Sequence, residues 1–377
     1  MTSPRFTLLA ATALATLPLM TTAQEDGGNT SSGQSTGASE QPAGEGAPAG
    51  PDGSPGTQSA QVPPGNMQQD GTSPGDAGSE AEPQDAPSQG APQPGASDSS
   101  AFTEPQELPE VGADWPFWGG DAQATRYSPL DQITPDNVDQ LERAFVFHTG
   151  DMPEGTAEGK YSPEITPLKL GDNVLMCSAM NILISIDAES GEENWRYDPG
   201  VPNDAIPYGA TCRGVSIWTD PEAAEDDICK TRLVQATLDA KIIALDAEEG
   251  VPCTEFGENG MIDLWEDLGQ RVPGWYAVTA PPSIVRGVIV TGAQVKDGQA
   301  EDAPSGVIRG FDARTGELAW AWDLGAPEQN RDGPPEGEVY TRGTPNMWTT
   351  AVSDEELGYV YLPLGNSSVD YWGSNRS

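Results

Sequence analysis

Histidine and basic residues are scarce in this 377-residue chain, and each shortage excludes a class of function. The single histidine, His148, argues against a Ser-His-Asp triad and a histidine-rich metal site, and we expect it to be packed or solvated. Lysine and arginine total 18 against 59 acidic residues, and the net charge is −41. Nucleic acid is therefore excluded as a partner, because binding to phosphates requires a basic face.

Long apolar runs are also lacking, apart from one at the N-terminus. Residues 1–23 have the features of a secretory signal peptide: Arg5, an apolar run over 6–20, and small residues before Gln24. The run is shorter than the roughly 20 apolar residues that a membrane span requires, although an uncleaved anchor remains an alternative. We therefore expect export to the periplasm, with membrane association left open and no integral membrane segment after signal cleavage.

Aromatic and β-branched residues are nearly missing from 24–113, which consists mainly of Gly, Pro, Ser, Gln, Ala and acidic residues. Such a segment cannot bury enough apolar surface to offset the entropy of ordering it. The composition predicts a disordered acidic linker over 24–113 and a folded domain over 114–377.

Cysteine is limited to Cys177, Cys212, Cys229 and Cys253. Their spacing does not match a structural zinc site. In an exported chain they predict one or two disulfides. Three pairings are open if all four cysteines are used.

A short pattern occurs three times in the folded region. The copies are LISIDAESGEENW (183–195), IIALDAEEGVPCT (242–254) and VIRGFDARTGELAW (307–320). Each joins an apolar strand, Asp-Ala and a Gly turn, and the first and third end in Trp195 and Trp320, where the second has Thr254. Repeats about 60 residues apart, each the length of one four-stranded sheet, predict an all-β propeller. The tryptophans are expected to pack between neighbouring blades.

Several segments resemble one family, in the same order. They are DWPFWGGDAQATRYSPLDQITPDNVDQL (114–141), ITPLKLGD (165–172), TCRGVS (211–216), SGVIRGFDARTGELAWAWD (305–323) and YVYLPLGNSSVDYWGSNRS (359–377). They resemble the pyrroloquinoline quinone (PQQ) dependent, or quinoprotein, dehydrogenases. Within that family the chain is most similar to the branch of membrane-bound glucose dehydrogenases and quinate/shikimate dehydrogenases.

The resemblance implies an eight-bladed β-propeller that holds PQQ and a calcium (Ca2+) or magnesium (Mg2+) ion near its axis. The metal would act as a Lewis acid on the cofactor, and an aspartate would remove the proton of a substrate hydroxyl. The implied substrate is a small molecule, either a glucose-like sugar or a polyol. Electrons would pass to a respiratory quinone or a periplasmic electron carrier.

Six residues match cofactor or metal positions of the family. The resemblance assigns Glu164 to the cofactor rim, Arg213 to a PQQ oxygen, Thr279 to a PQQ carboxylate and Trp348 to stacking on the ring system. It assigns Asp297 and Asn366 as oxygen ligands of the metal, with Ser368 nearby. Each has a structural alternative: a salt bridge for Arg213, blade packing for Trp348, and loop or turn positions for Asp297 and Asn366.

The chain also departs from the family. The family's catalytic domain is about twice as long as 114–377, so we expect only about the first half of the blades here. The proton-abstracting aspartate and a cofactor-contacting lysine are expected beyond residue 377, and this N-terminal fragment should be inactive alone. Gly209 stands where glucose-type enzymes carry a substrate-contacting histidine, so a sugar, a polyol and a cyclic hydroxy acid such as quinate all remain open.

A signal peptide and linker replace the five membrane helices of the glucose branch, which leaves the electron acceptor open. The main alternative function is a non-catalytic propeller that serves as a binding scaffold in the cell envelope. A scaffold would have no need of polar residues such as Arg213 and Asp297 outside the repeat. A third alternative is a folded but inert domain, since fold alone does not determine function.

Overall fold

The computed structural model describes residues 102–298, 300–329, 332–371 and 373. The signal peptide expected over 1–23 and most of the expected linker lie outside these residues. Within the described ranges, the helices are short 3-10 turns, and none of them has the length and apolarity to cross a membrane. They are η1 (Val138–Gln140), η2 (Gly155–Ala157), η3 (Asn203–Ala205) and η4 (Pro327–Gln329).

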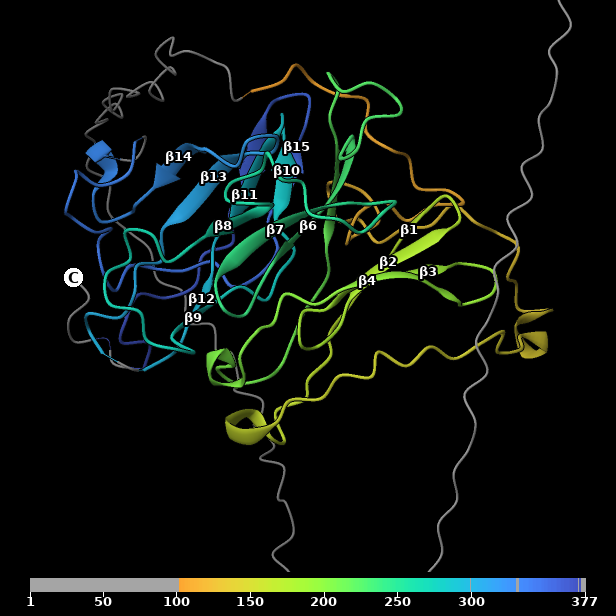
Figure 1. The fold of residues 1–377 in the computed structure, drawn as a ribbon, viewed down its shortest axis with the longest axis horizontal. Coiled ribbons are helices and arrows are strands. Elements are labelled where there is room, and N and C mark those ends of the chain that lie inside the picture. Colours follow the sequence, from red (N-terminus) through yellow and green to blue (C-terminus); the bar gives the residue numbers. More distant parts are fainter. Residues whose placement is uncertain (1–101, 299, 330–331, 372, 374–377) are drawn as a thin grey trace, which may run out of the picture. The chain divides into compact units, whose positions relative to one another are not determined.

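Three four-stranded antiparallel sheets follow one another along the chain and lie side by side in that order (Figure 1). The first contains β1 (Leu168–Leu170), β2 (Asn173–Cys177), β3 (Leu183–Asp187) and β4 (Glu193–Tyr197). The second contains β5 (Ser216–Thr219), β6 (Thr231–Ala236), β7 (Lys241–Asp246) and β8 (Met261–Asp263). The third contains β10 (Ser283–Val285), β11 (Val288–Thr291), β13 (Ile308–Asp312) and β14 (Leu318–Trp322).

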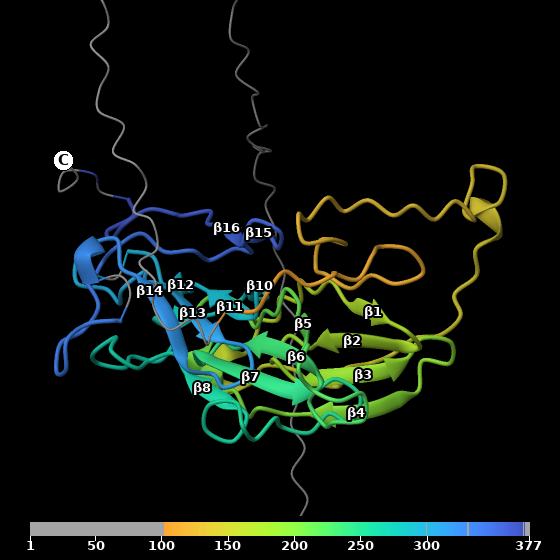
Figure 2. The ribbon, with the colours of Figure 1, turned by 90° about the horizontal axis from the view of Figure 1, so that it is seen from above.

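Two smaller pairs complete the fold: β9 (Tyr276–Ala277) with β12 (Gln294–Val295), and β15 (Val352–Asp354) with β16 (Tyr359–Tyr361). Figure 2 shows the four strands of the first sheet layered from β1 to β4. Consecutive four-stranded meanders of this kind are propeller blades. The predicted all-β propeller architecture is confirmed as a set of partial propeller sheets.

The Asp of each repeat closes the turn that follows its strand. The carboxylate Oδ1 atoms of Asp187, Asp246 and Asp312 each accept backbone N–H groups two and three residues later, at 2.7–3.1 Å. The turn glycines have positive φ angles of 73°, 69° and 76°, a conformation that suits glycine; they are Gly191, Gly250 and Gly316. The D-A-x-x-G pattern therefore encodes an Asx turn at the same edge of each sheet.

An aromatic ring from an earlier part of the chain lies over each of the first two turn glycines. A Cβ atom on Gly250 would lie 2.4 Å from the Trp195 ring, and one on Gly191 would lie 2.4 Å from the Phe145 ring. Where the second repeat has Thr254 in place of Trp, the backbone of Gly257 approaches Gly316 instead. Trp195 therefore packs between sheets, as predicted.

Trp320 occupies the corresponding position in β14, the last strand of the third sheet. It packs against an apolar cluster that joins that sheet to Met347, Ala351 and Val360, which precede or belong to the β15–β16 pair. The Trp320 ring also lies over Gly310 of its own sheet, because a Cβ atom there would lie 2.4 Å from Trp320 Cε2, so its role between blades stays a prediction. Other apolar clusters join the first sheet to the second and the second to the third.

Both disulfides form, and the structure selects one of the three pairings that the sequence left open. Cys177 pairs with Cys212 across 35 residues, and Cys229 pairs with Cys253 across 24. The first joins the end of β2 to the segment that leads into β5, and so crosses from the first sheet to the second.

The N-terminal described segment is bound to the domain, although its composition assigned 102–113 to the disordered linker. The Thr103 amide donates to the Arg286 carbonyl at 2.9 Å, and the Gln106 amide donates to Glu355 Oε1 at 3.1 Å. These bonds use backbone donors, which composition does not reveal. The boundary of the linker at residue 113 stays a prediction, and these two bonds show contacts of 102–106 with the domain.

Candidate functional site

Four of the predicted cofactor residues occupy equivalent places in successive sheets. Glu164, Arg213, Thr279 and Trp348 lie three or four residues before β1, β5, β10 and β15, respectively. These are the first strands of their sheets, and β10 contacts both β5 and β15. Because the first strands of propeller blades line the common axis, the segments that lead into them meet at one end of it.

Arg213 is the centre of this cluster. Its Nε lies 2.9 Å from Glu164 Oε2, and its Nη1 donates to Thr279 Oγ1 and, at 3.4 Å, to the Trp348 carbonyl. Its guanidinium carbon lies 5.7 Å from the centroid of the Trp348 ring. The structure thus brings all four residues together around one guanidinium.

The backbone of Arg213 is held as firmly as its side chain. Its amide donates to the Thr279 carbonyl at 2.9 Å, and its carbonyl accepts from the Thr166 amide at 3.0 Å. Trp118 covers the next residue, because a Cβ atom on Gly214 would lie 3.0 Å from Trp118 Cδ1. The Arg126 guanidinium lies over the Trp118 ring, 4.1 Å from its centroid.

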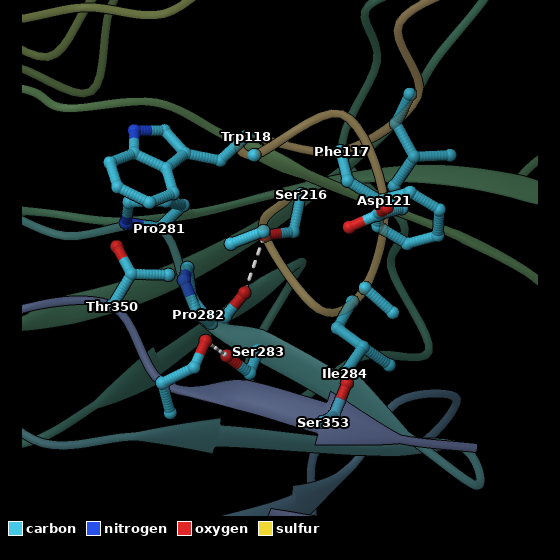
Figure 3. A pocket seen from close by; sticks show the side chains of 15 residues that line it. Phe117, Trp118, Asp121, Ser216, Pro281, Pro282, Ser283, Ile284, Thr350 and Ser353 are labelled. Carbon is cyan, nitrogen blue, oxygen red and sulfur yellow. Dashed lines mark hydrogen bonds between the residues drawn. The ribbon is translucent and has the colours of Figure 1, made fainter. Parts of the chain in front are cut away.

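A small cavity of about 50 Å³ adjoins this position, and Figure 3 shows Trp118 next to Pro281 at its edge. The loop that contains Phe117, Trp118 and Asp121 forms one wall of the cavity. Ser216 and Ser283 also line the cavity, and their hydroxyls donate to the Pro282 and Ala351 carbonyls. The loop therefore fills the space between the first strands of the second and third sheets, beside the Arg213 cluster.

Accessibility differs within the cluster. The Arg213 side chain is 20% exposed, whereas Trp348 is 47% exposed. A large, half-exposed indole beside a shielded guanidinium offers a stacking surface and a directional hydrogen-bond donor to a planar anion. Glu164 balances the charge of Arg213 and fixes the plane of the guanidinium.

The predicted metal ligands are arranged differently. Asp297 and Asn366 lie in exposed loops, and the Asp297 amide donates to the Tyr208 hydroxyl at 2.8 Å. The next amide, of Gly298, donates to Asp370 Oδ2 at 3.0 Å, so the loop of Asp297 contacts the segment that follows Asn366. Among the residues that the structure describes, no three side chains of His, Cys, Asp or Glu group to hold a metal ion.

Comparison with known proteins identifies the family. Residues 115–377 match the PQQ family model, described as "Glucose/ethanol/alcohol dehydrogenase, beta-propeller domain". The chain belongs to the PQQ-dependent dehydrogenase family. The resemblance inferred from the motifs is confirmed, including its branch, since glycerol, glucose and quinate dehydrogenases are among the relatives.

Individual relatives match this PQQ-family chain over most of its length. The glycerol dehydrogenase large subunit of Gluconobacter oxydans (strain 621H) is 44% identical over 296 residues, which are 78% of this chain and 38% of that protein. The quinoprotein glucose dehydrogenase of Escherichia coli (strain K12) is 40% identical over 270 residues, which are 70% and 34%. The crystal structure of quinohemoprotein alcohol dehydrogenase from Comamonas testosteroni matches with a TM-score of 0.51 and 25% identity, over 68% of this chain and 36% of that one.

The chain therefore spans little more than a third of the length of these curated relatives. For PQQ, a planar quinone with carboxylate groups, the residues fit: Arg213 and Thr279 can donate hydrogen bonds, and the Trp348 indole is open on its surface. For the metal, Asp297 and Asn366 would need further oxygen ligands such as carbonyl or hydroxyl groups. The roles of all six residues stay predictions.

Motif reading alone did not find two residues, Trp118 beside the Arg213 cluster and Tyr208 beside Asp297. Trp118 belongs to the opening segment, and its contact with Gly214 could have been suspected because a glycine directly after Arg213 permits close approach. Tyr208 carried no motif signal. Burial and the nearby Asp297 carboxylate raise its pKa, although the Asp297 amide opposes this shift, so the hydroxyl stays protonated at neutral pH.

Proposed function

We propose that this chain provides the PQQ-holding part of an oxidoreductase that oxidises a hydroxyl group of a polyol or sugar. The observation that carries the proposal is the convergence of Glu164, Thr279 and Trp348 on the Arg213 guanidinium, each residue from the segment that leads into a different sheet. A propeller that served only as a scaffold would not need a half-exposed tryptophan beside a shielded arginine at its axis.

The proposed roles follow from the geometry of each group. Arg213 binds a carboxylate or quinone oxygen of the cofactor, and Glu164 keeps the guanidinium oriented. The Thr279 hydroxyl accepts from Arg213 and donates to the Trp348 carbonyl at 3.4 Å. When PQQ binds, this hydroxyl would turn its hydrogen from that carbonyl to a second cofactor oxygen. Trp348 provides the stacking surface. When bound, PQQ would supply the acceptor for the hydride of the substrate alcohol.

The substrate class is proposed from the relatives and from Gly209. The relative that is 44% identical is named a glycerol dehydrogenase subunit, which favours a polyol, with a glucose-like sugar next and a cyclic hydroxy acid of the quinate type as the alternative. A Cβ atom at Gly209 would lie 2.8 Å from Ser162 Cβ, so this backbone does not accept a larger side chain without moving. The aspartate that would abstract the proton of the substrate hydroxyl stays a prediction, and we expect it in the part of the relatives' length that lies outside the matched residues.

The remaining parts of the proposal concern the metal, the location and the electron acceptor. Asp297 and Asn366 would contribute oxygen ligands to a calcium or magnesium ion. The N-terminal signal pattern and two disulfides support the periplasm, since disulfides persist in oxidising compartments. A respiratory quinone or a periplasmic carrier would then receive the electrons.

The proposal is tested by titrating the chain with PQQ and following the quenching of tryptophan fluorescence and the cofactor's absorbance. W348A should weaken binding by about 5- to 150-fold, because stacking on an aromatic side chain contributes about 1–3 kcal/mol. The matched control is Y361A, which removes another half-exposed aromatic outside the cluster and should bind PQQ as wild type does. Equal affinity of W348A and wild type would remove the stacking role, and a wild-type chain that binds no PQQ would refute the proposal.

A further inference from the structure

We propose that the Cys177–Cys212 disulfide is a positioning element for Arg213, and that it tunes the cofactor site in addition to stabilising the fold. Cys212 directly precedes Arg213, and its sulfur is bonded to the residue that ends β2 in the neighbouring sheet. The inference rests on the proposed function, because the effect is expected on PQQ binding.

The disulfide lies in a fully packed environment. Cys177 and Cys212 are 1% and 3% exposed and belong to the apolar cluster between the first and second sheets. The buried Gln235 side chain donates to Cys212 Sγ at 3.3 Å, and the buried Asn181 side chain donates to the Thr211 carbonyl at 3.4 Å. The core-facing side of segment 211–213 is thus held by one covalent bond and two side-chain amides.

The axis-facing side of the same segment is held only by hydrogen bonds and one ion pair. The Arg213 backbone bonds to Thr279 and Thr166, and its guanidinium contacts Glu164, Thr279 and Trp348. These partners belong to three other sheet units. Without the Cys177–Cys212 bond, only these weaker contacts hold segment 211–213, and the segment can shift. The Arg213 guanidinium then moves with its backbone.

The second disulfide provides a matched control. Cys229–Cys253 closes a loop of similar length, 24 residues against 35, and is also buried. Because stabilisation by a crosslink varies only slowly with loop length, removing either disulfide should lower the melting temperature to a similar extent. Its contacts are with Asp246 and Arg232 on the second sheet and not with the Arg213 cluster.

The experiment compares C177A/C212A with C229A/C253A in the full chain, at a temperature below both melting transitions. C177A/C212A should weaken PQQ binding by about tenfold or more, the effect expected when a supporting contact of a ligand site is lost. C229A/C253A should bind PQQ as wild type does despite its lower melting temperature. Unchanged PQQ affinity in C177A/C212A, or an equal loss in both variants, would overturn the proposal. C177V/C212A restores part of the buried volume and replaces the first variant if that variant does not fold.

A second readout separates this inference from the proposed function. Modification of Arg213 by a dicarbonyl reagent, followed by mass spectrometry, reports the position of the guanidinium without any cofactor. It should be faster in C177A/C212A than in wild type and unchanged in C229A/C253A. If the wild-type chain binds no PQQ, the proposed function fails while the labelling rates still decide the positioning role, and equal rates in all three proteins refute it.

Discussion

The contact between Trp195 and Gly250 determines how the first sheet packs on the second, and a single methyl group can test it. A Cβ atom on Gly250 would lie 2.4 Å from Trp195 Cδ2 and 2.7 Å from Cγ, both atoms of a rigid ring. The same glycine has a φ of 69°. Replacement by alanine therefore introduces backbone strain and a steric clash between the sheets.

The two costs can be separated by a control at Gly200, whose φ is 68° and whose Cβ position has no neighbour within 4 Å. An alanine in the left-handed region costs about 1–2 kcal/mol, and this is the whole cost expected for G200A. Overpacking adds about 1–3 kcal/mol, so G250A should lower the free energy of unfolding by about 2–5 kcal/mol. The difference between the variants measures the packing of the first sheet against the second.

Urea unfolding of the full chain, followed by tryptophan fluorescence, provides these free energies, provided that the slope against urea stays the same in all variants. In a W195A background the excess cost of G250A should vanish, because the ring that causes the clash is gone. An equal loss of stability in G250A and G200A would show that Trp195 does not pack on this turn as described.

Two further predictions concern buried polar groups. R232M should lower the free energy of unfolding by about 3 kcal/mol. Arg232 is 1% exposed and donates to the Ala313 and Arg314 carbonyls, which would lose their donor in the variant. An unchanged free energy of unfolding for R232M in urea would contradict this. Burial raises the pKa of Tyr340 to about 12, against about 10 in the unfolded chain, so its contribution is complete below pH 10 and is lost as the pH rises to about 12. Y340F should therefore lose less stability than wild type between pH 10 and 12 in denaturant titrations, and parallel curves would refute the assignment.

The sequence predicted the fold because its signals are local. An Asx turn needs only an aspartate and the amides two and three residues later, so the pattern around Asp187 is readable without any long-range contact. The glycine that follows predicts a backbone position with a positive φ. An aromatic residue such as Trp195 predicts the surface on which the next sheet packs. Three copies of this combination were enough to predict consecutive sheets.

Long-range pairings were not predictable in the same way. The pairing of Cys177 with Cys212 depends on how the first sheet meets the second, and cysteine spacing carries no information about that. The segment at Thr103 was assigned to the linker because its composition resembles the preceding residues, yet its backbone amide finds an acceptor on Arg286. The family resemblance suggested the members of the Arg213 cluster, and their common place before the first strand of each sheet explains why they meet.

The construction of this cluster connects site geometry to sheet packing. Arg213 precedes the second sheet, while Glu164 precedes the first and Thr279 the third. The distance from Arg213 to Glu164 therefore depends on the interface that Trp195 and Gly250 form, and the distance to Thr279 depends on how β10 packs on β5. A shift at either interface should weaken the binding of a planar anion by this guanidinium, because misplacement by about 1 Å is enough to weaken a site of this kind. Cofactor affinity in this chain should thus report the order and packing of its sheets as well as the identity of the four residues.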